Sequence, residues 1–120
     1  MTLRRTAILL VLAAAAAIPS TALARSNVHS LVGVVGPGYT ITLKQSGKAV
    51  KTLKVGAYTI KVEDKSPIHN FHLFGKGLNK LTATDFSGTK TWKVSLKAGR
   101  YTFQCDSHAT LGMKGTFRVK

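Results

Sequence analysis

The sequence predicts a single all-β domain, a sandwich or small barrel of seven or eight short strands. Apolar and polar residues alternate with a period of two through most of the chain after residue 25, as in strands with one buried and one solvated face. Gly, Pro and Ser interrupt these runs at short intervals, which is typical of hairpin-rich folds. No part of this region has a sustained helical period, and 120 residues suffice for one domain at most.

The predicted strands are the segments in which the alternation is clearest. In chain order they are residues 39–43, 58–62, 92–96, 101–105 and 117–119. Turn signals separate them at 36–38, 46–47, 66–67, 75–77, 87–88, 98–99 and 112–115. Residues 79–85 are the only stretch in which we expect a single helical turn.

The N-terminus has the pattern of an export signal. Two arginines precede an apolar run over residues 7–18, and small residues around Ala24 complete a secretory signal peptide over residues 1–24. A membrane anchor is the alternative, but this run is short against the ~20 residues that a spanning helix needs. We therefore expect cleavage after Ala24 and a periplasmic or extracellular domain over residues 25–120.

The chain is strongly basic, with 18 Lys and Arg against 4 Asp and Glu and a net charge of +14. Loss of the leader removes two arginines and leaves +12 on 96 residues. Such a charge favours acidic partners and anionic surfaces. Because no nucleic-acid motif is present, we expect an acidic redox protein as partner and weak association with an anionic envelope surface. We also expect a monomer without a transmembrane segment in its mature form.

One loop near the C-terminus carries the side chains best suited to metal chemistry. Cys105, His108 and Met113 follow the spacing C-x-x-H-x-x-x-x-M around the single Cys of the chain. Thiolate and thioether select soft Cu(I), while imidazole also suits Cu(II), so the set fits an ion that changes oxidation state. Cys105 could instead be an inert buried thiol and Met113 a core side chain. Both spacings would then be coincidences at the only Cys, which we consider the weaker interpretation.

A further ligand must come from elsewhere, and the segment 67–72 offers His69 and His72. In a strand these two side chains point to opposite faces, because their separation is odd. Only one of them can face the site, and spacing alone does not say which. His29 lies near the expected mature N-terminus and is interpreted as a polar surface residue.

Two motifs carry a family resemblance. Residues 101–115 read Tyr-x-Phe-x-Cys-x-x-His-x-x-x-Gly-Met-x-Gly, and His69 is followed by Asn70. With them the chain resembles the plastocyanin-type cupredoxins, or type 1 blue copper proteins, over nearly all of residues 25–120. The resemblance implies a Greek-key β-sandwich and a backbone donor from Asn70 toward the Cys sulfur. Ser107 departs from the pattern, since relatives often have Pro there.

The resemblance also implies the ligands. One copper ion would be bound by His69, Cys105 and His108, with Met113 as a weak axial ligand. His69 matches the family ligand because Asn follows it. His72 is then a hydrogen-bonded or surface histidine of a strand.

These residues predict an electron carrier that cycles one copper ion between Cu(I) and Cu(II). His108 is the expected electron port, and Lys76 and Lys114 are expected to border the contact patch around it, where they would steer an acidic partner. The patch itself is expected to consist of Ala109, Leu111 and Gly112.

Other functions remain open at the sequence level. A copper carrier or buffering protein of the envelope would use the same ligands without shuttling electrons. A basic surface-binding sandwich with a vestigial site is a third interpretation, which the presence of all four ligands disfavours. An enzyme is not expected, because the chain has no Ser-His-Asp order, no carboxylate pair, no glycine-rich phosphate loop and no His-x-His pair of the multicopper oxidases.

Overall fold

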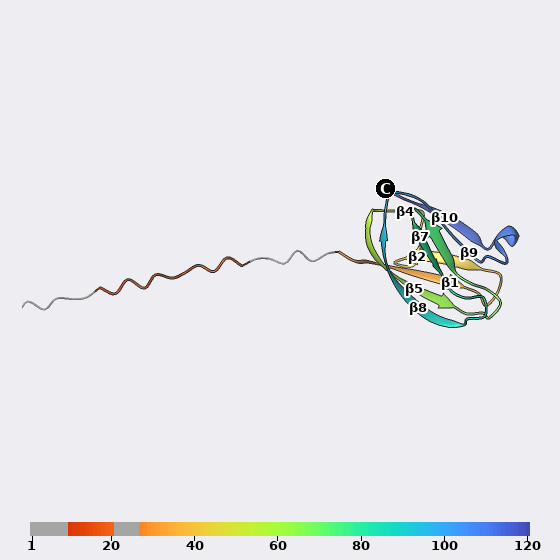
Figure 1. The fold of residues 1–120 in the computed structure, drawn as a ribbon, viewed down its shortest axis with the longest axis horizontal. Coiled ribbons are helices and arrows are strands. Elements are labelled where there is room, and N and C mark those ends of the chain that lie inside the picture. Colours follow the sequence, from red (N-terminus) through yellow and green to blue (C-terminus); the bar gives the residue numbers. More distant parts are fainter. Residues whose placement is uncertain (1–9, 21–26) are drawn as a thin grey trace, which may run out of the picture.

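The computed structural model describes residues 10–20 and 27–120 (Figure 1). Residues 10–20 are exposed and lie outside any helix or strand. The predicted cleavage site after Ala24 falls outside the described residues, so the leader stays a prediction. Within the two described ranges, no helix is long and apolar enough to cross a membrane.

The domain is a sandwich of two five-stranded sheets. Ten strands are present where seven or eight were predicted, because short pairings add to the long alternating segments. The strands are β1 (His29–Val35), β2 (Ile41–Gln45), β3 (Lys48–Ala49), β4 (Thr52–Leu53), β5 (Gly56–Asp64), β6 (His72–Gly75), β7 (Leu78–Leu81), β8 (Gly88–Leu96), β9 (Gly99–Gln104) and β10 (Lys114–Val119).

The sheet order fixes which loops meet at each end of the sandwich. One sheet has the order β3-β2-β1-β5-β8, and the other has the order β4-β10-β9-β6-β7. β1 runs parallel to β5, and their last residues, Val35 and Asp64, pair with each other. Both strands therefore finish at the same end of the sheet. β9 pairs antiparallel with β6 and β10. The segments that follow β1, β5 and β9 therefore gather at one end of the domain, which we call the site end.

The core lies between the sheets and consists of the inward-facing residues of the alternating segments. At its centre the rings of Phe71 and Phe103 stack with their centroids 6.0 Å apart and their planes 3° apart. Gly33 of β1 leaves room for this stack, since a Cβ there would lie 2.6 Å from the Phe71 ring, and Gly115 does the same beside Phe103. The buried apolar residues are Leu31, Val35, Leu43, Val50, Leu53, Tyr58, Ile60, Val62, Phe71, Leu73, Val94, Leu96, Tyr101, Phe103, Cys105, Met113, Phe117 and Val119.

Two local predictions differ from the structure. Residues 78–81 pair with β6 as β7, so the helical turn expected over 79–85 is reduced to one hydrogen-bonded turn, in which the Phe86 amide donates to the Ala83 carbonyl (3.0 Å). A 3₁₀ helix forms at η1 (Ala109–Leu111), where the chain reverses within a few residues between β9 and β10. Tyr39 is exposed in the loop before β2 rather than buried in a strand.

Candidate metal centre

Three side chains from two loops meet at the site end. Cys105 follows β9 directly, and His108 lies three residues later in the loop to β10. His69 lies in the turn between β5 and β6, where the Ser66 hydroxyl accepts a hydrogen bond from the Ile68 amide (3.3 Å) and the Ser66 carbonyl accepts one from the His69 amide (3.4 Å). A serine hydroxyl that bonds the backbone two residues later is a common way to fix a turn.

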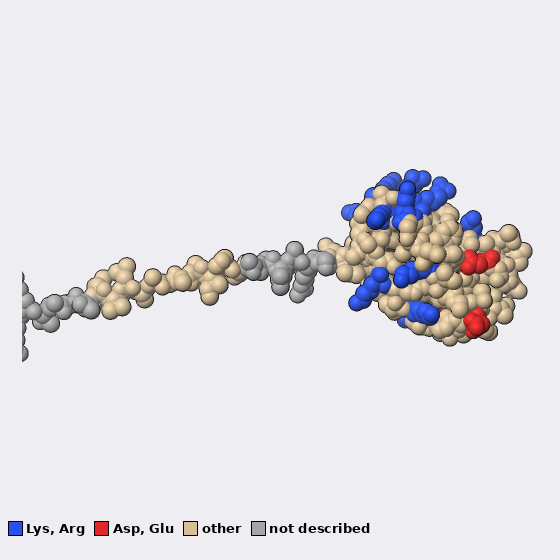
Figure 2. Space-filling view, in the orientation of Figure 1, with Lys and Arg blue, Asp and Glu red and all other residues tan. Residues whose placement is uncertain are grey.

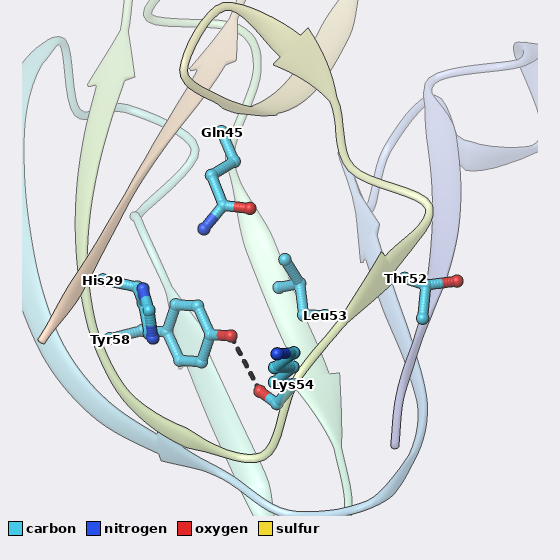
Figure 3. A pocket seen from close by; sticks show the side chains of 6 residues that line it. All are labelled: His29, Gln45, Thr52, Leu53, Lys54 and Tyr58. Atoms are coloured by element: carbon cyan, nitrogen blue, oxygen red, sulfur yellow. Dashed lines mark hydrogen bonds between the residues drawn. The ribbon is translucent and has the colours of Figure 1, made fainter. Parts of the chain in front are cut away.

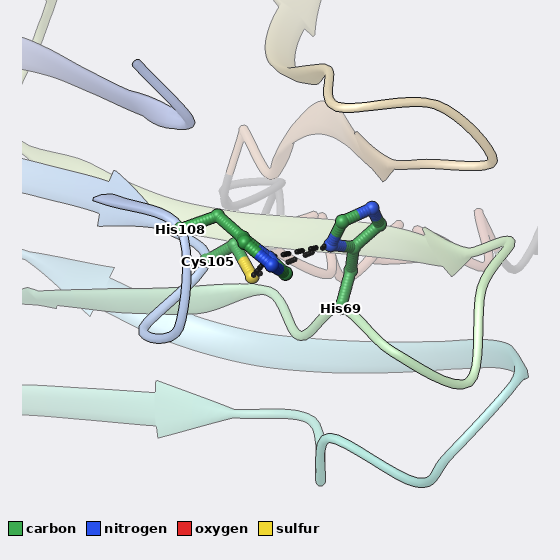
Figure 4. Close-up of side chains that lie close together, drawn as sticks. All are labelled: His69, Cys105 and His108. Atoms are coloured by element: carbon green, nitrogen blue, oxygen red, sulfur yellow. Dashed lines mark hydrogen bonds between the residues drawn. The ribbon is translucent and has the colours of Figure 1, made fainter. Parts of the chain in front are cut away.

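The donor atoms of these residues converge (Figure 4). Sγ of Cys105 lies 3.7 Å from Nδ1 of His69 and 3.5 Å from Nδ1 of His108, and the two Nδ1 atoms are 3.0 Å apart. A triangle with these sides has its centre about 2.0 Å from each corner, a metal–nitrogen bond length and slightly short of a metal–sulfur bond. The three residues therefore surround a point at which one ion could contact all of them.

Burial favours metal binding by these atoms. Cys105 and His69 are both fully buried, whereas His108 is partly exposed. Nε2 of His69 is buried and has no hydrogen-bond partner among the described residues. A neutral imidazole that keeps its proton on Nε2 presents a free lone pair on Nδ1, the atom that faces the cluster. One soft sulfur and two imidazole nitrogens form a donor set that suits copper or zinc.

The loop from Cys105 to Met113 is closed by its own backbone. The Cys105 amide donates to the Met113 carbonyl (3.0 Å), and the amides of His108 and Met113 donate to the carbonyls of Cys105 (3.1 Å) and His108 (3.2 Å). Gly112 adopts φ 94°, a left-handed conformation that glycine accepts most readily. Met113 is fully buried, and its backbone is hydrogen-bonded to Cys105 and His108. Its role as an axial ligand stays a prediction.

A pair of hydrogen bonds ties the two loops together. The Asn70 side chain donates to the Asp106 carboxylate (2.9 Å) and accepts from the Asp106 amide (2.8 Å). Because these residues are the immediate neighbours of His69 and Cys105, the pair fixes the two ligand segments relative to each other. The expected backbone contact from Asn70 to the Cys sulfur stays a prediction.

His72 is confirmed as a hydrogen-bonded strand histidine. Its Nδ1 lies 2.8 Å from the Asp106 carboxylate and its Nε2 lies 2.6 Å from the Asn79 side-chain oxygen. The expected reason is wrong, however, because His69 lies in a turn and only His72 belongs to β6. Burial acts to raise the pKa of Asp106, but hydrogen bonds, from Gln104 first and then from His72, hold this pKa below its ordinary value.

A second hydrogen-bond network holds the chain on both sides of His69. The buried Asp64 carboxylate accepts from the Thr82 hydroxyl (2.8 Å) and the Ser66 amide (3.3 Å), while the Thr82 oxygen accepts from the Phe71 amide (2.8 Å). Burial raises the pKa of Asp64, and these hydrogen bonds act in the other direction. This network was not predicted, because a single acid at the end of an alternating segment gives no sign of its partners.

The surface above the cluster is apolar and partly different from the predicted patch. The Tyr39 ring meets the His69 and His108 rings edge-on, with centroids 5.1 and 5.0 Å away. Leu111, which was predicted, is 69% exposed there, and Ile68, which was not, is 55% exposed. Tyr39 and Ile68 were missed because they follow turn signals rather than the Cys motif.

One predicted neighbour of this surface is wrongly placed. The Lys76 side chain packs against Gly99, at the start of β9 and thus at the opposite end from Cys105. β6 runs away from the site and Gly75 lies level with Tyr101, so the next residue cannot border His108. Lys114 is close to the site, because it pairs with Gln104.

The sequence matches no protein-family model and no curated protein sequence. Among solved structures, the copper protein rusticyanin matches with a TM-score of 0.61 at 18% identity, over 78% of each chain. Rusticyanin from Thiobacillus ferrooxidans matches with a TM-score of 0.53 at 20% identity, over 78% of this chain and 77% of that chain. Auracyanin from Roseiflexus castenholzii matches with a TM-score of 0.56 at 17% identity, over 77% of this chain and 97% of that one.

These matches show the fold. The chain has the cupredoxin-like β-sandwich that its motifs predicted. At such low identities the likeness is one of fold, and the metal centre rests on the geometry of His69, Cys105 and His108.

Proposed function

We propose that this chain is an exported copper protein that binds one copper ion and transfers single electrons. His69, Cys105 and His108 would hold the ion, with Met113 as a weak axial ligand. The observation that carries the proposal is the point about 2.0 Å from Sγ and from both Nδ1 atoms. Bound copper would supply one-electron exchange between Cu(I) and Cu(II).

The role of the protein is to keep the donors in one arrangement. The Asn70–Asp106 pair locks the two ligand loops together, and the stacked rings of Phe71 and Phe103 lie two residues from His69 and Cys105 respectively. Donors that are held from both sides rearrange little when the charge of a bound ion changes. Such rigidity favours fast electron exchange over release of the ion.

Electrons would enter and leave at the partly exposed edge of His108. The side chains of Tyr39, Ile68 and Leu111 are exposed around this edge and give it an apolar rim. An apolar, partly exposed rim lets a partner approach closely without a large desolvation cost. Two matched structures carry names that fit this use, since one is called a copper protein and the other a dithionite-reduced auracyanin.

A copper carrier would use the same donors. An electron carrier differs from it in how easily another molecule can reach the donor atoms and remove the ion. Cys105 and His69 are fully buried, which hinders the ligand exchange that handing over an ion requires. Export and the absence of enzymatic activity belong to the same proposal and rest on the leader pattern and on the lack of catalytic motifs.

Voltammetry and copper exchange on the same sample test the proposal. The copper-loaded protein should give a reversible one-electron wave, and it should lose its ion only slowly to a Cu(I) chelator. Rapid and complete transfer to the chelator without a reversible wave would instead identify a carrier. Zinc binding with no stable copper complex would contradict both functions.

A further inference from the structure

The charges of the domain are separated between its two ends. Figure 2 shows the largest group of Lys and Arg over the end that holds β4 and the C-terminus, further cations along the middle of the domain, and Asp and Glu toward the other end. We call the first end the basic pole. Its exposed cations are Lys48, Lys51, Lys54, Lys76, Lys97, Arg100, Arg118 and Lys120.

The strand register places these residues together. Arg118 pairs with Arg100, and the Lys120 amide donates to the carbonyl of Leu53, next to Lys54. Lys76 packs on Gly99, at the start of β9. Four segments of the chain, residues 48–54, 76, 97–100 and 118–120, thus bring their cations to one end of the sandwich.

The acidic residues lie at the site end. All four of them, Glu63, Asp64, Asp85 and Asp106, lie in the half that contains the metal centre. Several cations of that half are already engaged. Lys61 and Lys65 lie 3.1 and 3.9 Å from Glu63, and Lys90 lies over the Phe86 ring. The basic pole therefore carries eight cations and no acid, whereas the site half holds all four acids of the domain.

We propose that the basic pole binds the surface of an anionic lipid bilayer and turns the metal centre away from it. Anionic lipids attract Lys and Arg within about one screening length of the surface, and the contributions add over the cations that reach it. The eight cations of the pole sit on loops and strand ends, where long side chains reach past the backbone. This inference needs neither copper nor electron transfer.

The composition of the pole favours a bilayer over an acidic protein. Six of its eight cations are Lys, a residue that is depleted in specific protein interfaces. Among the described residues, no exposed Phe, Tyr or Trp side chain lies at this end, whereas single-stranded nucleic acids are bound by stacking on such rings.

Two further features fit a lipid surface. Val55 and Val28 are 55% and 53% exposed at this end, so apolar tips stand among the cations and can enter the headgroup layer. A hollow of about 320 Å³ also opens here, lined by His29, Gln45, Thr52, Leu53, Lys54 and Tyr58 (Figure 3). The Tyr58 hydroxyl donates to the Lys54 carbonyl (2.7 Å), and the Lys54 ammonium and the Gln45 amide, which line the same hollow, would meet a headgroup phosphate.

The orientation follows from the length of β9. Its six residues lead from Gly99 at the pole to the residue before Cys105, a distance of about 20 Å at 3.4 Å per residue. β1 begins at His29 at the same pole, so the preceding chain also emerges on the side that would face the lipid. The surface around His108 would then stay open to a soluble partner.

Vesicle sedimentation tests this proposal. The full chain is expressed, and the protein is purified from the exported fraction. It is mixed with vesicles of phosphatidylcholine alone or with 30% phosphatidylglycerol, over a salt series. We expect binding to the anionic vesicles only, with at least a tenfold loss of affinity between low salt and about 0.15 M.

Two charge-matched variants locate the binding surface. The pole variant replaces Lys48, Lys51, Lys54 and Lys97 with Gln, and the control replaces Lys61, Lys65, Lys90 and Lys114 with Gln. Both lose four positive charges, but only the pole variant should lose most of its binding. Equal losses would mean that net charge alone acts, and equal retention or binding to neutral vesicles would assign the effect to apolar contacts. Each of these results would overturn the proposal.

A fluorescence experiment tests the orientation. Val55→Trp places a reporter at the pole and Leu111→Trp places one at the site end, with Trp92 as a common background. Brominated lipids should quench the first reporter and leave the second unchanged. Quenching at Leu111, or binding to duplex DNA but not to vesicles, would contradict the proposed surface.

Discussion

The two ends of this sandwich are built in different ways. At the site end, three donor atoms lie within 4.8 Å of one another, and buried hydrogen bonds hold the loops that carry them. At the basic pole, eight exposed cations sit on four segments, and within residues 10–20 and 27–120 none of them forms an ion pair with an acid. Ligand binding at the site end depends on the exact positions of a few atoms, whereas binding at the basic pole would depend on the sum of its charges.

This difference predicts how each end responds to substitution. A position-dependent site should fail when one donor is removed, because the other donors cannot move to compensate. A charge-dependent surface should lose only about 1 kcal/mol of lipid attraction per cation. The following experiments break or sharpen that contrast, from the largest expected effect to the smallest.

The largest effect is expected from the two neighbouring histidines. His69→Ala should abolish the visible absorption of the copper-loaded protein, because it removes one of three converging donors. His72→Ala should leave the spectrum nearly unchanged and cost about 1 kcal/mol of unfolding free energy, since it removes hydrogen bonds to Asp106 and Asn79. Absorption spectra and denaturant unfolding measure both effects. The reverse outcome would place the wrong histidine at the metal.

The next effect concerns the packing below the site. Gly33→Ala adds a methyl group that would lie 2.6 Å from the Phe71 ring, so the stack must shift. Overpacking of this kind costs about 1–3 kcal/mol. Because Phe71 lies two residues after His69, the copper absorption band should also shift. Gly38→Ala is the matched control, since a Cβ there meets nothing within 4 Å. Equal stability of the two variants would show that the stack does not restrain the site.

A third effect tests the predicted axial ligand. Met113→Leu should keep the copper and the colour but raise the reduction potential, because loss of a weak donor destabilises Cu(II) more than Cu(I). A tenfold selective loss of Cu(II) affinity corresponds to about 59 mV for one electron. Voltammetry of both proteins gives the shift. Loss of copper would make Met113 a primary ligand, and an unchanged potential would mean that it is no ligand.

The smallest effect is expected from single lysines. Lys114→Gln should slow electron transfer to an acidic redox protein roughly twofold at low salt, because this residue lies near the centre. Lys76→Gln removes the same charge at the far end and should change the rate less. Stopped-flow rates between 0.01 and 0.1 M salt, where the screening length falls from ~30 to ~10 Å, measure the difference. Equal effects of the two variants would reject docking at the site end.

The parts of the molecule that the sequence predicted are those that depend on local spacing. The alternating residues of β5 and β9 gave the strands, and the spacing within residues 105–113 gave two donors, because a tight loop brings residues close without long-range information. His69 was distinguished from His72 only through the family resemblance.

The remaining features depend on contacts between distant segments. The stack of Phe71 on Phe103, the network of Asp64 and Thr82, and the position of Tyr39 over both histidines join residues whose register the sequence does not reveal. The misplacement of Lys76 has the same cause. The separation of charge also became visible only once the strands were paired, since Lys residues are spread evenly along the chain.

Titration of the metal-free protein with Cu(II) tests the central claim most directly. The three donors predict one ion per chain and an intense visible band from the Cys105 thiolate, with Cys105→Ser as the variant that should lose the band. Absorption at each addition, together with the copper content after desalting, gives both quantities. A band that saturates at one equivalent in the wild type and is absent in the variant is the predicted result. A colourless complex of the intact protein, or a coloured complex of the variant, would contradict the proposed copper centre.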